Sequence, residues 1–335
     1  MASIAEPQGP TTATRGRAGE GLPAGWRVVA RKELADHLLS LRFAVLLVLL
    51  GLAAVGAVYA AAGGIRDAAA QTSGIPALFL LLFTAAPERI PPFYVLIGFL
   101  APLLGIAFGF DAINGERSQG TLPRLLAQPL HRDDVINGKF VAGLTVIALI
   151  LGVFTLVVAG VGMLRLGIVP TPAEVARILV YLVVSIVYVG FWLALANLCS
   201  VALRRAATSA LVAIAAWLVL TLFATLLVGL VADALAPVPA DATPGELVRS
   251  VTLQQNLARL SPNALYQEAT AVLLNPRARA VGFLLPVQVD QAVPSRLDLG
   301  QSLLLVWPQI VALVAVTVVL FAASYVLFLR QEIRA

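Results

Sequence analysis

Residues 111–139 read DAINGERSQGTLPRLLAQPLHRDDVINGK and form a polar stretch between two long apolar runs. The stretch concentrates acidic and basic side chains in a chain of which only 12% is charged. A simple turn between two antiparallel helices needs only about two to five residues. We therefore expect this stretch to lie outside the bilayer and to bind a second protein.

The composition around this stretch is that of an integral membrane protein. Hydrophobic residues make up 60% of the 335 residues, and the mean hydropathy is +0.92. Soluble domains contain about 45–50% apolar residues. The net charge of +5 comes from basic residues that flank the apolar runs, where membrane topology accounts for them. We expect membrane lipid as a partner and no nucleic acid, because no basic surface with interleaved aromatic residues is evident.

Six apolar runs are long enough to cross about 30 Å of hydrocarbon as helices. The expected spans are residues 43–62, 91–110, 135–164, 175–201, 206–232 and 302–329. The sequence therefore predicts an all-α fold, with one six-span membrane domain over residues 25–335. Residues 1–24 are rich in Gly, Thr, Pro and Ala and predict a disordered tail.

Residues 26–42 predict an amphipathic helix before the first span. Apolar side chains recur at helical spacing from Trp26 to Leu41, and charged residues, among them Glu33, lie on the other side. That pattern is typical of a helix in the headgroup region, and a cytoplasmic extension of the first span fits it equally well.

The distribution of Arg and Lys predicts the orientation. Basic residues precede the first span, fill the loop at 111–134, separate spans four and five, and follow span six. These positions share one side, so the positive-inside rule places both termini in the cytoplasm. The loop at 233–298 then lies on the outer side.

That outer loop contains apolar segments too short to span. Ser261 is suited to cap a helix, Pro262 to open it, and Asn275-Pro276 to end it. We expect short helices here that are re-entrant or lie across the mouth of a pathway, with an ordinary outer cap as the alternative. The residues assigned to this extracytoplasmic gate are Ser261, Pro262, Leu265 and Tyr266.

Small residues recur on one side of the first two spans. Ala53 and Ala57 form such a stripe in the first, and Gly105 and Gly109 in the second. Stripes of this kind allow two helices to approach closely. We expect them at a helix-packing or dimer interface, and packing within one chain explains them as well.

The sequence contains no pattern that indicates catalysis or a metal site. The segment from Asn137 to Phe140, NGKF, lacks the upstream glycine and the Ser or Thr of a phosphate-binding loop. Cys199 is the single cysteine, and His37 and His131 lack partners at ligand spacing. The chain is therefore not expected to be an enzyme or to hold a cofactor. Asp111 and Lys139 are near span ends, where their charges can reach water.

Three strings together resemble the type-2 ABC transporter permease family, and in particular its NosY-like bacterial members. The first is ERSQGTL at 116–122, together with the residues that follow it as far as Gly138-Lys139. The second is ARKELADHLLSLRF at 30–43, and the third is LSPNALYQEAT at 260–270. The resemblance covers residues 25–330 and implies a location in a bacterial cytoplasmic (inner) membrane. It implies a permease subunit that pairs with a second protomer, identical or different. It also implies a separate cytoplasmic ABC ATPase, which binds ATP and Mg.

In that family the loop between spans two and three is a coupling helix seated on the ATPase. The resemblance implies this role for Glu116, Arg117, Gly120, Thr121, Leu122, Leu125 and Leu126. Gly120 would allow a tight turn and Thr121 would cap the following helix, with Pro123 in its first turn. An exporter is the expected activity. The alternatives are an ATPase-linked scaffold that transmits force without transport, and a secondary transporter or channel.

Overall fold

The chain is helical throughout the part that the structure, a computed structural model, describes. This part comprises residues 25–71, 77–85, 91–121, 130–237, 242–276 and 297–331, and no strand occurs in it. The expected tail at 1–24 lies outside the described residues. The elements are α1 (Gly25–Leu38), α2 (Leu41–Gln71), η1 (Leu78–Leu80), α3 (Leu81–Thr84), α4 (Phe93–Leu100), α5 (Pro102–Gly109), α6 (Asn114–Ser118), α8 (Arg132–Leu166), α9 (Pro172–Ala202), α10 (Ala206–Trp217), η2 (Leu218–Phe223), α11 (Ala224–Leu235), α12 (Pro244–Ala258), α13 (Pro262–Leu274) and α15 (Leu299–Arg330).

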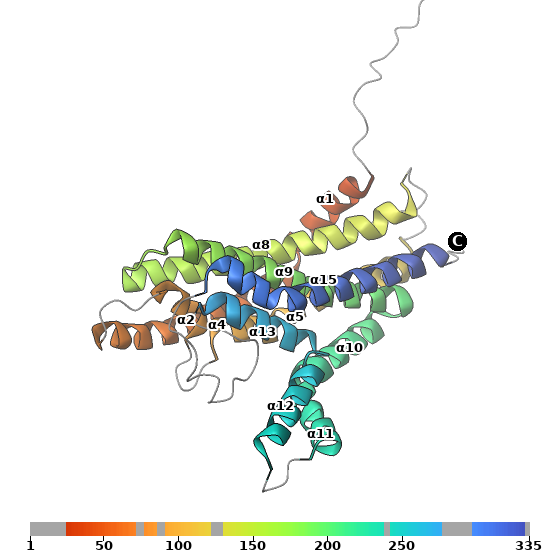
Figure 1. The fold of residues 1–335 in the computed structure, drawn as a ribbon. Coiled ribbons are helices and arrows are strands. Elements are labelled where there is room, and N and C mark those ends of the chain that lie inside the picture. The colour runs from red at the N-terminus through yellow and green to blue at the C-terminus, as the bar shows by residue number, and fades with distance from the viewer. Residues whose placement is uncertain are drawn as a thin grey trace, which may run out of the picture.

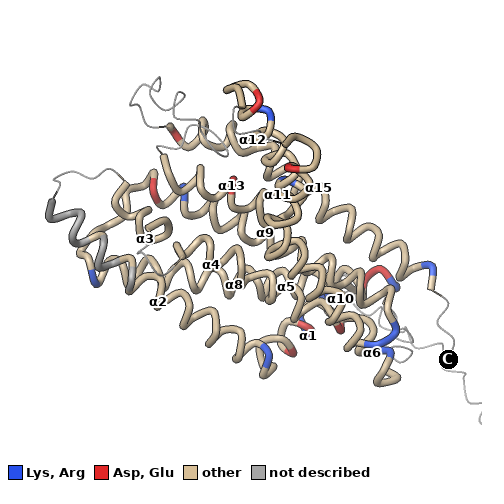
Figure 2. The backbone as a smooth tube through the Cα atoms, turned by 90° about the horizontal axis from the view of Figure 1, so that it is seen from below, with Lys and Arg blue, Asp and Glu red and all other residues tan. Residues whose placement is uncertain are grey.

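Six helical segments of the described chain are long and apolar enough to cross a membrane, as predicted. They are Leu41–Tyr59, Phe93–Ser118, Arg132–Leu166, Pro172–Ala202, Ala206–Leu235 and Leu299–Arg330. The charged residues lie mainly near the two ends of the bundle, and long uncharged lengths of helix separate them (Figure 2). This arrangement is what a multi-pass membrane protein requires, because charges at mid-membrane are costly.

Helix α9 is the centre of the bundle. It packs against α5, α8, α10, α13 and α15. In its most apolar window 61% of the residues are buried, against 11% for the segment Ala206–Leu235 and 11% for α15. The large side chains of Tyr181, Tyr188 and Trp192 fill the core along α9. The exposed apolar faces of α11 and α15 are therefore left for lipid or another protein.

Local capping chemistry explains where several helices begin and end. Thr171 and Glu174 form a capping box at the start of α9, with Pro172 in the first turn. Ser261 caps α13 and Pro262 opens it, as the sequence predicted, and Asn275 ends it. Gly167 ends α8 in the left-handed conformation with φ of 66°.

The bundle has two distinct ends. Helices α1 and α6, the start of α8, and the last turns of α9 and α15 lie together at what is called here the terminal end (Figure 1). Helices α3 and α13 and the first turns of α9 and α15 lie at the distal end. Helix α10 packs against α9 and α5, and α11 diverges from the other spans and packs along α12 (Figure 1).

A π-helical turn, η2, separates α10 from α11. The wider turn displaces backbone groups from the regular ladder, and such turns are often stabilised by side chains inserted from neighbouring elements. Here the hydroxyl of Ser261 donates to the carbonyl oxygen of Leu220. The residue that caps α13 therefore also attaches α13 to η2.

The glycine stripe of the second span packs within the chain. A Cβ atom on Gly105 would lie 2.6 Å from the carbonyl oxygen of Val189 and 2.7 Å from the amide nitrogen of Leu193. On Gly109 it would lie 2.7 Å from the Cβ of Ala196. Both glycines thus let α5 contact the backbone of α9. Ala57 is buried and Ala53 partly buried on α2, which packs against α8, α3 and α4.

Candidate functional site

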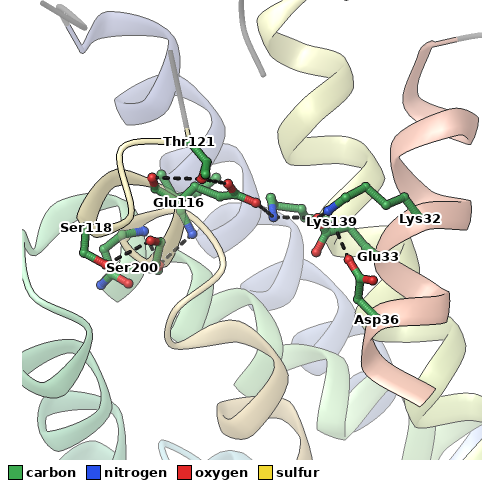
Figure 3. Close-up of polar contacts among 11 residues, drawn as sticks. Lys32, Glu33, Asp36, Glu116, Ser118, Thr121, Lys139 and Ser200 are labelled. Atoms are coloured by element: carbon green, nitrogen blue, oxygen red, sulfur yellow. Dashed lines mark hydrogen bonds and ion pairs between the residues drawn. The ribbon is translucent and has the colours of Figure 1, made fainter. Parts of the chain in front are cut away.

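The terminal end contains a cluster of charged side chains around the polar stretch at 111–139. Within that stretch the structure describes residues 111–121 and 130–139. The expected coupling residues Leu122, Leu125 and Leu126 lie outside the described residues. The cluster joins α1, α6 and α8 (Figure 3).

Lys139 occupies the centre of this cluster. Its Nζ donates to Oε1 of Glu33 at 2.8 Å and to Oε1 of Glu116 at 3.4 Å. Only 6% of the Lys139 side chain is exposed. The expectation that this charge extends to water was therefore wrong, because two carboxylates neutralise it inside the protein.

Helix α1 lies along the first half of α8. The backbone nitrogen of Trp26 donates to Oδ1 of Asp134 at 2.9 Å. Val29 packs closely on Gly138, because a Cβ atom added to Gly138 would lie 2.6 Å from the Cβ of Val29. Val29 and Glu33 are the buried residues of α1. Glu33 was expected on the polar outer side, and this was wrong because it pairs with Lys139. Leu41, expected on the apolar side of this helix, instead begins α2 and is exposed.

The turn around α6 is attached to α9 through Ser200. Its Oγ accepts from the backbone nitrogens of Ile113 at 2.9 Å and of Asn114 at 3.2 Å. After α6 the chain turns at Gly120, whose φ of 67° is left-handed. Thr121 follows, and its hydroxyl contacts both the carboxylate and the carbonyl oxygen of Glu116. The glycine predicted to permit a tight turn therefore does so.

Arg117 faces the C-terminal end of the chain. Its guanidinium donates to the side-chain oxygen of Gln331, and Arg132 donates to the Gln331 carbonyl oxygen at 3.2 Å. Gln331 in turn donates to the carbonyl oxygen of Val201 at 2.8 Å. Arg117 thus has a partner within the protomer, and so do Glu116 and Thr121. The family resemblance implies that these residues contact another subunit, and that role stays a prediction.

A cavity of about 390 Å³ lies beside the cluster between α1, the start of α2 and the turn at α6. Arg42 and Asp111 pair across it at 2.6 Å. His37 lies edge-on to Phe108, and burial lowers its pKa, so the imidazole is neutral at pH 7. Partial burial lowers the pKa of Lys32, but the hydrogen bond to Asp36 and the nearby carboxylates raise it more, so this lysine stays charged.

The distal end contains a clamp that the sequence analysis missed. Arg177 is buried and donates to the carbonyl oxygen of Leu273 at 2.9 Å, to that of Leu297 at 2.6 Å, and to Ser302 Oγ at 3.1 Å. One turn earlier, Glu174 accepts from the backbone nitrogen of Phe79 at 3.1 Å. The sequence signal that could have indicated this clamp is the pair of opposite charges, Glu174 and Arg177, one turn apart at the start of an apolar span. Their partners come from segments far away in the sequence.

The residues assigned to an outer gate lie in the packed interior of the distal end. Tyr266 is fully buried and stacks on Tyr188 with ring centroids 4.4 Å apart. Its hydroxyl oxygen lies 3.1 Å from Ser185 Oγ. Leu265 is also buried. Helix α13 packs against α9, α15 and α4. A gating role for these residues stays a prediction.

No group of three or more His, Cys, Asp or Glu side chains that could hold a metal ion occurs among the described residues. The charged side chains of the cluster at the terminal end are paired, and they form hydrogen bonds and ion pairs with one another. What this arrangement can do chemically is to hold three helices and a turn together at one end of the bundle.

The family model of the ABC-2 family transporter proteins matches residues 27–333 of this chain. The chain belongs to that family. The match runs from α1 to the C-terminal end of α15, so it includes both the charged cluster and the distal clamp.

Two curated relatives have the same printed name, probable ABC transporter permease protein NosY. That of Pseudomonas aeruginosa is 37% identical over 161 residues, which are 46% of this chain and 49% of the relative. That of Stutzerimonas stutzeri is 38% identical over 128 residues, 36% of this chain and 39% of the relative. The alignments thus span half or less of the length of these relatives.

Proposed function

We propose that this chain is the membrane-spanning permease subunit of an ATP-binding cassette exporter, driven by a separate cytoplasmic ATPase that binds ATP and Mg. The observation that carries the proposal is the family match over residues 27–333, which covers all six candidate spans. Two relatives named as probable ABC transporter permeases support it. The sequence itself contains no motif for ATP hydrolysis.

The coupling site for the ATPase is the segment 111–128. Its described part, 111–121, continues the second span, and residues 130–139 lead into and form the first turns of α8. A rigid connection between two spans can transmit a displacement to both of them. The hydrogen bonds to Ser200 and the pairing of Glu116 with Lys139 supply that rigidity.

The exposed apolar faces of the segment Ala206–Leu235 and of α15 are where lipid and a second permease protomer bind. The ABC permease family implies a dimeric arrangement in general, and in the proposed assembly the second protomer completes the pathway. In this arrangement Ser261–Asn275 lies beside that pathway at the distal end.

We expect Gly120→Val to uncouple the two subunits. Gly120 has a φ of 67° with no atom within 4 Å of an added Cβ, so valine introduces backbone strain without a collision. Asparagine tolerates this conformation and provides the matched control. In vesicles that contain the chain and the ATPase that copurifies with it, the hydrolysis rate relative to the isolated ATPase should fall about threefold to thirtyfold with valine.

Gly120→Asn should hold that ratio close to the value of the unmodified chain. Equal ratios for valine, asparagine and glycine would show that the turn does not couple the subunits. Failure of any ATPase to copurify with the unmodified chain in mild detergent would remove the proposed function itself. Glu116→Arg is the less informative variant, because it also places a second cation beside Lys139.

The proposal places the terminal end in the cytoplasm. Ser118 is exposed at that end, and Arg249 is a charged, exposed residue of α12. In a Cys199→Ala background, a cysteine at Ser118 should react with an impermeant maleimide only from the cytoplasmic face of inner-membrane vesicles. A cysteine at Arg249 should react only from the other face, and labelling of both from one face would contradict this topology.

A further inference from the structure

A single buried ammonium group connects two segments that are far apart in the sequence. Lys139 of α8 donates to Glu33 of α1 at 2.8 Å and to Glu116 of α6 at 3.4 Å. The exposed fraction of the side chain is 6% for Lys139, 12% for Glu33 and 20% for Glu116. Removing Lys139 leaves two partly buried carboxylates without the cation that they share, so the positions of both depend on it.

A second ammonium group contacts the same carboxylate in a different environment. Lys32 lies 3.4 Å from Glu33 and 3.0 Å from Asp36, but 57% of its side chain is exposed. Ion pairs exposed to water contribute little to stability. The two lysines are therefore a natural comparison, since both contact Glu33 and only one is buried.

The remaining contacts hold α1 and α6 to different helices. α6 is attached to α9 through Ser200, and α1 is attached to α8 through Trp26 and the close approach of Val29. Lys139 is the residue of α8 that contacts both α1 and α6, as Figure 3 shows. Helix α1 ends at Leu38, and α2 begins at Leu41.

We propose that Lys139 is a positioning residue that holds α1 and α6 as one unit with the start of α8. A displacement of the segment 111–121 then moves α1 and, through the short turn at 39–40, the first span as well as the second and third. The functional part of this inference rests on the proposed function, because a displacement requires the ATPase. The rigid link can be measured without any partner.

The first experiment measures the link in the chain itself, reconstituted in lipid vesicles. Spin labels are attached to cysteines at Arg31 and Ser118, which are exposed on α1 and α6, in a Cys199→Ala background. Pulsed electron paramagnetic resonance gives the distribution of distances between them. We expect a narrow distribution in the parent and in Lys32→Met, and a clearly broader one in Lys139→Met.

A Lys139→Met distribution as narrow as that of the parent overturns the proposal. Should Lys139→Met fail to insert, the triple variant Glu33→Gln, Glu116→Gln, Lys139→Met has no unpaired buried charge and replaces it. The triple variant is expected to show the same broadening, since it also lacks the link. A narrow distribution in the triple variant would equally overturn the proposal.

The second experiment measures hydrolysis by the complex with the ATPase that copurifies. Lys139→Met should lower the rate of the complex relative to the isolated ATPase by about threefold or more, while binding of the ATPase is retained. Lys32→Met should match the parent. If no ATPase binds the parent chain, the proposed function fails, and the distance measurement still decides whether Lys139 holds α1 to α6. Equal ratios for both variants and the parent overturn the coupling role of Lys139.

Discussion

Gly105→Ala is expected to lower the thermal unfolding midpoint of the protein and the yield of folded protein, although it adds a single methyl group. The new Cβ would lie 2.6 Å from the carbonyl oxygen of Val189, 2.7 Å from the backbone nitrogen of Leu193 and 2.9 Å from the Cβ of Trp192. Two of these atoms belong to the backbone of α9, which cannot move aside as a flexible side chain would. Overpacking of this kind costs about 1–3 kcal/mol and occasionally more.

The measurement is the thermal unfolding midpoint in detergent, together with the yield of monodisperse protein. Gly56→Ala is the matched control, because no atom lies within 4 Å of a Cβ added there. The control should leave the midpoint within error of the parent. If Gly105→Ala instead unfolds like the parent but fails to form dimers, the stripe contacts a second protomer rather than α9.

Features that depend on local rules were predictable from the sequence. A helix beginning at Ser261-Pro262 and ending at Asn275 follows from capping preferences that need no tertiary information. The six spans follow from length and hydropathy, which the bilayer itself dictates. The glycine stripe likewise indicated close approach of another helix, but small residues alone do not identify which one.

Pairings between distant segments were not predictable in the same way. Glu33 and Lys139 are separated by 106 positions, and each taken alone fits a charged residue at a water-exposed helix surface. Their burial became evident only once α1 lay along α8. The coupling role proposed for Glu116, Arg117 and Thr121 stays a prediction. The structure adds that each of them also has a partner inside the protomer.

Arg177→Met is the second substitution with a large expected effect, and it acts at the distal end. The guanidinium donates to the carbonyl oxygens of Leu273 and Leu297 and to the hydroxyl of Ser302. Leu273 lies in the last turn of α13, where helix carbonyls lack partners within the helix and the helix dipole favours a cation. Methionine has a similar length, but it leaves these oxygens without a donor.

The expected loss is about 2–4 kcal/mol, from buried acceptors that are left unpaired. Arg177 joins α13 to the segment that begins α15. The loss of stability should therefore be concentrated in these two helices, in addition to any effect on the protein as a whole. Hydrogen–deuterium exchange in detergent should therefore rise at the C-terminal half of α13 and the start of α15, and stay unchanged along α8. Arg249→Met, which removes an exposed arginine of α12, is the matched control.

Arg177→Lys separates charge from geometry in this clamp. Lysine retains the positive charge but has a single ammonium group. Unlike the forked guanidinium, that group cannot reach the oxygens of Leu273, Leu297 and Ser302 together. We expect intermediate exchange in α13, between the parent and Arg177→Met. Exchange identical to the parent in both Arg177 variants would mean that Arg177 does not hold α13 in the bundle.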